Sequence, residues 1–166
     1  MSMIQGLQQE LEQEAQTTRR VLERVPGDRL DWKPHAKSMS LGQLALHVAT
    51  LPGNVAEISR QTPFPLPQFV QPSPTNVAEL IPALEQSVAK AREILGSMDD
   101  ASLAKMWRAV DGEREVMALP VGAVLRAIML NHWYHHRGQL SVYLRQVGAL
   151  VPSIYGPSAD TVVATA

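Results

Sequence analysis

The sequence predicts an all-α protein, a four-helix bundle whose helices are joined by crossover connections rather than tight hairpins. Three observations support this prediction. Four segments repeat apolar residues at spacings of three and four, no segment shows the alternation of a half-buried strand, and no internal repeat is present. The chain has 166 residues, 45% of them hydrophobic, which is enough for one buried core. We therefore expect a single helical domain over residues 1–166.

The first two helices are predicted from their apolar spacing and their boundaries. The first helix spans about residues 3–24, and a loop is expected over residues 28–39. Ser40 and Gln43 have the spacing of a capping box, in which each side chain bonds the backbone N–H of the other residue, so the second helix starts there. Pro52 lies inside this helix, and we expect a kink because proline cannot donate to the carbonyl four residues earlier.

The third helix follows a proline-rich connection. Residues 62–74 contain five prolines, which exclude a continuous helix and predict an ordered, extended crossover. The helix starts at Thr75 or Asn76, and Asn76 has the spacing of a second capping box with Glu79. Residues 100–119 show no clear pattern, and we expect a short helical turn followed by irregular chain.

The fourth helix is predicted to run from Pro120 to about Gln146 and to stop at Gly148. Its inward stripe contains apolar residues and two histidines, namely Val121, Leu125, Ile128, His132, His136, Leu140 and Tyr143. The tail over residues 151–166 is expected to wrap the surface or to fray.

Composition excludes several classes of function. Lys and Arg number 15 against 16 Asp and Glu, without a basic run, so nucleic-acid binding is not expected. Cysteine is absent, which rules out disulfides, thiolate metal ligands and a cysteine nucleophile. The N-terminus does not have the pattern of a signal peptide, and no window of about 18 apolar residues exists. We therefore expect a cytoplasmic protein that acts on a small molecule, with no membrane partner, and that forms a homodimer, the commonest oligomer.

Three histidines form the candidate site. His132 and His136 are four residues apart and so project from one face of the fourth helix, and His47 lies on the apolar side of the second helix. Three neutral imidazoles plus water form the open arrangement of a catalytic metal site. The alternative is a set of core histidines satisfied by hydrogen bonds, which is the commoner role of a single inward histidine. Three inward histidines together make a site for one divalent metal as good an interpretation as this alternative, with zinc or nickel expected before iron or manganese.

Other polar and aromatic residues have weaker claims to the site. His135 points away from His132 on the helical wheel and is expected outside the ligand set, and His35 is expected to be exposed in its loop. Arg137 is expected to cap or pair at the surface. Tyr143, on the His136 side, is a candidate pocket residue.

The sequence resembles the DinB/YfiT-like superfamily over nearly its whole length. The similarity rests on LDWKP, SLGQLALHVA, NHWYHHRGQLSVYLRQVG and VPSIYGPS, with H-x3-H-R-G-Q as the most specific element. By this resemblance the metal triad of the family maps onto His47, His132 and His136. The resemblance also implies metal-dependent thiol S-transfer, since family members include transferases that use bacillithiol or mycothiol.

Three functions remain open at this point. The first is a metal-dependent enzyme that transfers a low-molecular-weight thiol, as a cosubstrate, to a small electrophile. The second is a metal-dependent hydrolase of a small molecule. The third is a non-catalytic metal-binding bundle with a role in stability or sensing. The sequence offers no clear general base, since Asp111 and Glu113 lie in the segment without a pattern.

Overall fold

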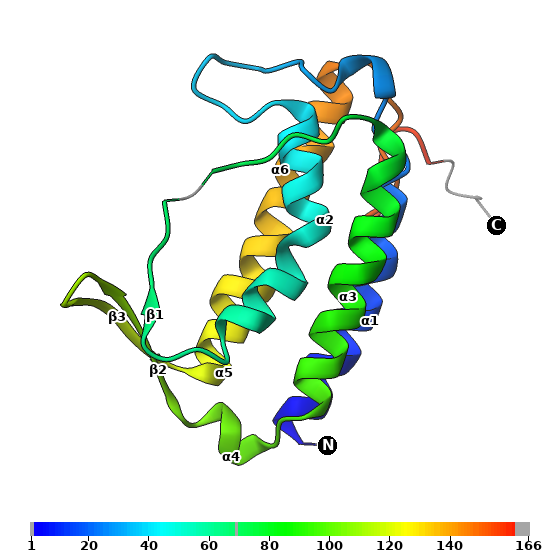
Figure 1. Ribbon diagram of the computed structural model, residues 1–166. Helices are drawn as coiled ribbons and strands as arrows, with labels where there is room; N and C mark the ends of the chain where they lie inside the picture. The colour runs from blue at the N-terminus through cyan, green and yellow to red at the C-terminus, as the bar shows by residue number, and fades with distance from the viewer. Residues whose placement is uncertain (1, 69, 162–166) are drawn as a thin grey trace.

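Helices form most of the fold, and the long ones lie side by side around the core (Figure 1). The structure is a computed structural model that describes residues 2–68 and 70–161. Its long helices are α1 (Met3–Leu22), α2 (Leu41–Ile58), α3 (Leu80–Gly96) and α6 (His132–Gln146). Its shorter helical segments are η1 (Gly27–Arg29), η2 (Val77–Glu79), α4 (Asp100–Leu103), α5 (Val121–Val124) and the π-helical η3 (Leu125–Asn131).

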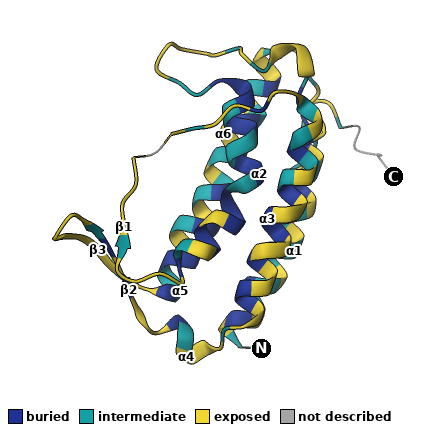
Figure 2. Ribbon diagram, in the orientation of Figure 1, coloured by how far each residue is buried: buried dark blue, intermediate teal, exposed yellow. Residues whose placement is uncertain are grey.

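The buried faces of the long helices point toward one another and enclose an apolar core (Figure 2). Most of these core residues are Leu, Val and Ala, as the helical spacing of the sequence predicts. Within the described ranges, no helix is both long and apolar enough to cross a membrane.

Both predicted capping boxes are present. At the start of α2, the Ser40 hydroxyl accepts from the Gln43 N–H at 3.1 Å, and the Gln43 side chain accepts from the Ser40 N–H at 2.9 Å. Asn76 and Glu79 cap η2, which leads directly into α3. These bonds satisfy N–H groups that have no partner within the first turn of a helix.

The predicted fourth helix consists of α5, η3 and α6 in succession. It begins at Val121 rather than Pro120, and it ends at Gln146 as expected. Gly148 follows with a φ of +79°, the left-handed conformation that commonly terminates a helix.

The prediction of an all-α four-helix bundle is confirmed only in part, because a small three-stranded sheet accompanies the helices. Strands β2 (Met106–Asp111) and β3 (Arg114–Pro120) form an antiparallel hairpin, and β1 (Phe64–Pro65) pairs parallel to β2. Gly112 starts the two-residue loop with a φ of +60°, which suits a hairpin turn of the II′ type. Strand β3 is exposed along nearly its whole length, so its residues do not alternate and the strand was missed. The protein is mostly helical with this added sheet.

Pro52 does not interrupt α2, because its missing hydrogen bond is replaced from α6. The proline cannot donate to the carbonyl of Val48, which is four residues earlier. That carbonyl instead accepts from the indole N–H of Trp133 at 2.8 Å. The helix runs unbroken from Leu41 to Ile58, and the bond ties the middle of α2 to the start of α6.

Helices α2 and α3 come into close contact at Gly53. The Gly53 N–H donates to the Ser87 hydroxyl at 2.8 Å, and that hydroxyl donates to the Thr50 carbonyl at 2.9 Å. A Cβ on Gly53 would lie 2.7 Å from the backbone oxygen of Ser87. Only glycine therefore allows the two helices to approach this closely at this position.

We expect Gly53→Ala to destabilise the protein by about 1–3 kcal/mol, because the added methyl forces the two backbones apart. Gly6→Ala is the matched control: Gly6 is also inside a helix, but its added Cβ meets nothing within 4 Å. That control should stabilise by up to about 1 kcal/mol through helix propensity. Urea unfolding of both variants tests this, and equal effects would contradict the close contact.

Arg137 is buried, which corrects the expectation that it pairs at the surface. Its side chain is 1% exposed and forms an ion pair with Glu14 of α1 at 2.5 Å. Its guanidinium also donates to the Tyr155 hydroxyl at 2.5 Å and lies 5.3 Å and 5.2 Å from the ring centres of Tyr134 and Tyr155. This network holds the C-terminal segment against α1 and α6.

The tail wraps the surface as far as it is described. Asp160 accepts from the Val151 N–H at 2.8 Å and pairs with Arg145 at 2.7 Å. The expectation for residues 162–166 lies outside the described residues.

Candidate metal centre

Three histidine side chains converge between α2 and α6. His47 comes from α2, and His132 and His136 come from successive turns of α6. Their ring centres are 4.4 Å apart for His132 and His136, 4.6 Å for His47 and His136, and 5.4 Å for His47 and His132. One ring nitrogen from each lies within 4.8 Å of the others, close enough for the three to hold one metal ion. The structure thus brings together the three predicted ligands.

Backbone and core contacts set the spacing of this cluster. The hydrogen bond from Trp133 to the Val48 carbonyl joins the residue after His132 to the residue after His47. Trp133 is completely buried, so the bond is shielded from water. The two halves of the cluster are therefore positioned by packing of α6 against α2 rather than by the histidines themselves.

The electrostatic environment favours neutral imidazoles. Burial, together with the smaller effects of the neighbouring His136 and His132, lowers the pKa of His47 to about 4. Burial is also the main cause that lowers the pKa of His132 and of His136. Neutral imidazole is the form that donates a lone pair to a metal.

Hydrogen bonds outside the cluster determine which nitrogens face inward. The Nδ1 of His136 lies 2.7 Å from the Gln139 amide oxygen, which can only accept, so Nδ1 carries the hydrogen. His132 bonds to the backbone of Ile128, which raises its pKa against the effect of burial. The bond to Gln139 leaves Nε2 of His136 with its lone pair directed into the cluster, where it faces Nε2 of His132.

The inward-facing nitrogens of the three histidines have lone pairs that a bound cation would satisfy. The Nε2 atoms of His132 and His136 are 2.6 Å apart, and two lone pairs at this distance repel unless a proton or a cation lies between them. Nε2 of His47 is buried and has no hydrogen-bond partner among the described residues. A buried nitrogen without a partner is costly, by about 1–3 kcal/mol. The residues present therefore fit a divalent metal.

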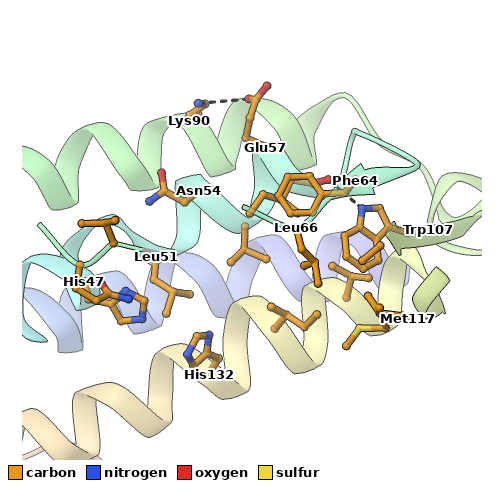
Figure 3. A pocket seen from close by; sticks show the side chains of 18 of the residues that line it. His47, Leu51, Asn54, Glu57, Phe64, Leu66, Lys90, Trp107, Met117 and His132 are labelled. Atoms are coloured by element: carbon orange, nitrogen blue, oxygen red, sulfur yellow. Dashed lines mark hydrogen bonds and ion pairs between the residues drawn. The ribbon is translucent and has the colours of Figure 1, made fainter. Parts of the chain in front are cut away.

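The cluster borders a cavity of about 580 Å³ that His47 and His132 line at one end (Figure 3). The rest of its lining comes from α2, α3, the proline-rich crossover, the β2–β3 hairpin, α5 and η3. His136 contacts both other rings from outside this lining. The site is thus open on one side to a space that could hold a ligand.

The weaker candidates lie outside the cluster. Tyr143 is not among the residues that line this cavity; its ring packs edge-on against Trp32 at 5.4 Å and its hydroxyl donates to the Met39 carbonyl. His135 is exposed beside His136, and His35 is exposed in its loop, as predicted.

Sequence reasoning missed one residue of the site, Gln139. It follows His136 by three residues, a spacing that places two side chains next to each other on a helix. The Gln of the H-R-G-Q motif was therefore a signal for the hydrogen bond that orients this ring.

Comparisons with known proteins agree on one family. A model of the DinB family matches residues 1–162. The chain is 27% identical over 148 residues to the uncharacterized protein YrdA of Bacillus subtilis (strain 168), a match that covers 89% of this chain and 84% of YrdA.

Two solved structures share the fold. A DinB-like protein from Bacillus cereus ATCC 10987 superimposes with a TM-score of 0.72 at 24% identity, over 91% of this chain and 97% of the other. The DinB-like protein YjoA from Bacillus subtilis gives a TM-score of 0.64 at 20% identity, over 86% and 92% of the two chains.

Proposed function

The chain belongs to the DinB family, and on that premise we propose that it is a metal-dependent enzyme that transfers a low-molecular-weight thiol to a small electrophile. His47, His132 and His136 hold one divalent ion, zinc or nickel in preference to iron or manganese. The observation that carries the proposal is the convergence of three neutral imidazoles on a cavity large enough for a substrate.

A divalent metal with three imidazole ligands keeps free coordination positions and lowers the pKa of a thiol that binds there. The protein contributes three things to this chemistry. The histidines are kept neutral by burial, Gln139 orients His136, and the apolar lining keeps water away from the substrate. In the reaction, the thiol sulfur forms a bond to the electrophilic carbon, the leaving group departs with its electron pair, and the thiol proton passes to solvent.

The charges around the cavity favour thiol transfer over hydrolysis. Hydrolysis commonly uses a general base to take a proton from water. The one carboxylate among the described lining residues is Glu57, which pairs with Lys90 at 3.4 Å. Asp111 and Glu113 lie at the exposed tip of the β2–β3 hairpin. A free thiol has a pKa of about 8.5, against about 15.7 for water, so a thiol is the easier of the two to ionise without such a base, and this lining suits it better.

The open cavity also distinguishes the proposal from a purely structural metal. A structural site is closed by four protein ligands, whereas the three histidines here adjoin a space for a further ligand. The described residues offer no fourth His, Cys, Asp or Glu within the cluster.

The test is metal content followed by thiol dependence. Elemental analysis of protein purified without a histidine tag should find about one divalent metal per chain, as one three-ligand cluster would hold. The loaded protein should then conjugate 1-chloro-2,4-dinitrobenzene only when a thiol such as bacillithiol or mycothiol is added. Turnover of ester substrates without any thiol would favour the hydrolase instead. Protein that takes up neither zinc nor nickel would overturn the proposal.

A further inference from the structure

The wall of the cavity opposite the histidines consists of apolar side chains that pack against one another. Figure 3 shows His47 and His132 at one end and Phe64, Trp107 and Met117 toward the other. Phe64 stacks on Trp107 with ring centres 6.0 Å apart. The indole N–H of Trp107 donates to the Ile58 carbonyl at 3.0 Å, which satisfies its polar atom. Both residues therefore present apolar surface to the cavity, with no unsatisfied polar atom on the indole.

Apolar side chains dominate the lining of the cavity, although Asn54 and Gln71 add two uncharged polar groups. Most of its lining is aliphatic or aromatic, including Leu51, Val55, Ile58, Phe64, Trp107 and Ile128. Apart from the histidines, the charged side chains among the described lining residues are Glu57 and Lys90, which pair with each other and are half exposed. No unpaired charge is thus available in this lining to hold a carboxylate or phosphate away from the histidine end.

The size and openness of the cavity suit a small molecule. Its volume of about 580 Å³ falls within the usual range of small-molecule sites. Leu66 of the crossover and Met117 of the hairpin line it and are themselves partly exposed, so they lie at its mouth. This end of the cavity is therefore accessible from solvent.

We propose that this cavity binds an uncharged alkyl or aryl group of the substrate, whose polar reactive end lies at the histidine cluster. The substrate class is thus an apolar electrophile with one polar end. The position of that polar end rests on the proposed function, because it requires the metal. The apolar affinity of the cavity does not, since it follows from the lining alone.

Two probes separate these parts. N-phenyl-1-naphthylamine is uncharged and lacks a strong metal-binding group; its fluorescence should rise on binding to the full chain with or without zinc. Alkylhydroxamic acids, from acetohydroxamic to octanohydroxamic acid, carry a metal-binding end. Calorimetry on zinc-loaded protein should show binding that strengthens by about fourfold for each buried methylene.

A pair of methionines on the hairpin supplies matched variants. Met117 lines the cavity and is 42% exposed, whereas Met106 is 49% exposed and is not among the lining residues. Met117→Glu places a charge beside the apolar ligand and should weaken binding of both probes on the order of tenfold. Met106→Glu should leave both unchanged. Because both side chains are partly exposed, neither variant is expected to disturb folding.

The outcomes distinguish failure of this inference from failure of the proposed function. Zinc-dependent binding of acetohydroxamic acid without any gain from longer chains, and without binding of the naphthylamine, would overturn the apolar site and leave the metal centre intact. In another outcome, Met117→Glu weakens binding of the naphthylamine, but the hydroxamates bind equally with and without zinc. This result would support the apolar site and overturn the metal centre. Equal effects of the two glutamate variants would also overturn the apolar site.

Discussion

Replacing His132 with alanine is expected to abolish stoichiometric zinc binding, with a loss of affinity of more than about 100-fold. Removing a hydrogen-bonded partner outside a ligand set already costs roughly 10- to 100-fold, so removing a ligand must cost more. The remaining His47 and His136 offer two nitrogens, which is too few for a stable site. Isothermal titration with zinc, checked by elemental analysis after dialysis, measures the effect.

His135→Ala is the matched control for this prediction. His135 is an exposed histidine on the same helix, and its ring lies 5.0 Å from His136 without joining the cluster. Its replacement should leave zinc affinity unchanged. Gln139→Ala should have an intermediate effect, weaker than that of His132→Ala and stronger than that of His135→Ala. We expect its zinc affinity to fall by roughly 10- to 100-fold, because the variant lacks the acceptor that orients His136.

Thermal unfolding separates loss of metal from loss of fold. Zinc that binds only the folded chain should stabilise it by about 4 kcal/mol at 1,000 times its dissociation constant. Zinc should stabilise the wild type by this amount and should not stabilise His132→Ala. Without metal, the two proteins should unfold at similar temperatures. Zinc binding by His132→Ala at wild-type strength would show that the cluster is a set of core histidines.

The second large effect is expected from Arg137→Met, which should destabilise the protein by about 3–5 kcal/mol. The substitution keeps most of the side-chain volume but leaves the Glu14 carboxylate, 13% exposed, without its ion-pair partner. It also removes the guanidinium that contacts the rings of both Tyr134 and Tyr155. The free energy of unfolding in urea measures the effect.

Arg126→Met provides the comparison on the same side of the molecule. Arg126 pairs with Glu10 of α1 at 2.6 Å, but its side chain is 46% exposed. An exposed pair contributes roughly 0–1 kcal/mol, so this variant should lose little. The double variant Arg137→Met, Glu14→Gln should recover part of the stability because no unpaired charge remains. If Arg126→Met and Arg137→Met lowered the free energy of unfolding by similar amounts, burial of the Arg137 ion pair would not explain its contribution to stability.

Local spacing was sufficient to predict the long helices and the histidines that converge between α2 and α6. The capping boxes at Ser40 and Asn76 follow from hydrogen bonds between residues three apart, which any chain with that sequence can form. In the same way, His132 and His136 share a face because they are four residues apart on one helix.

The hairpin and the cavity depended on contacts that local spacing does not contain. Strand β3 is exposed and lacks alternation, so its pairing with β2 was visible only through the Asp-Gly turn. The cavity brings the crossover and the hairpin against α2, and its apolar character depends on Trp107 bonding to Ile58, 49 residues away. Tyr143, judged from its side of the helix alone, packs against Trp32 instead.

The sequence alone therefore determined the helical segments, their caps and the three histidines, because each depends on neighbours within one or two turns. Only the tertiary structure decided that Arg137 is buried, since its partner Glu14 is 123 residues away in the chain and a charged side chain is normally exposed. It likewise decided where His47 meets His132, through the bond between Val48 and Trp133. Contacts of this kind form when helices pack, and packing depends on the shapes of all the surrounding side chains.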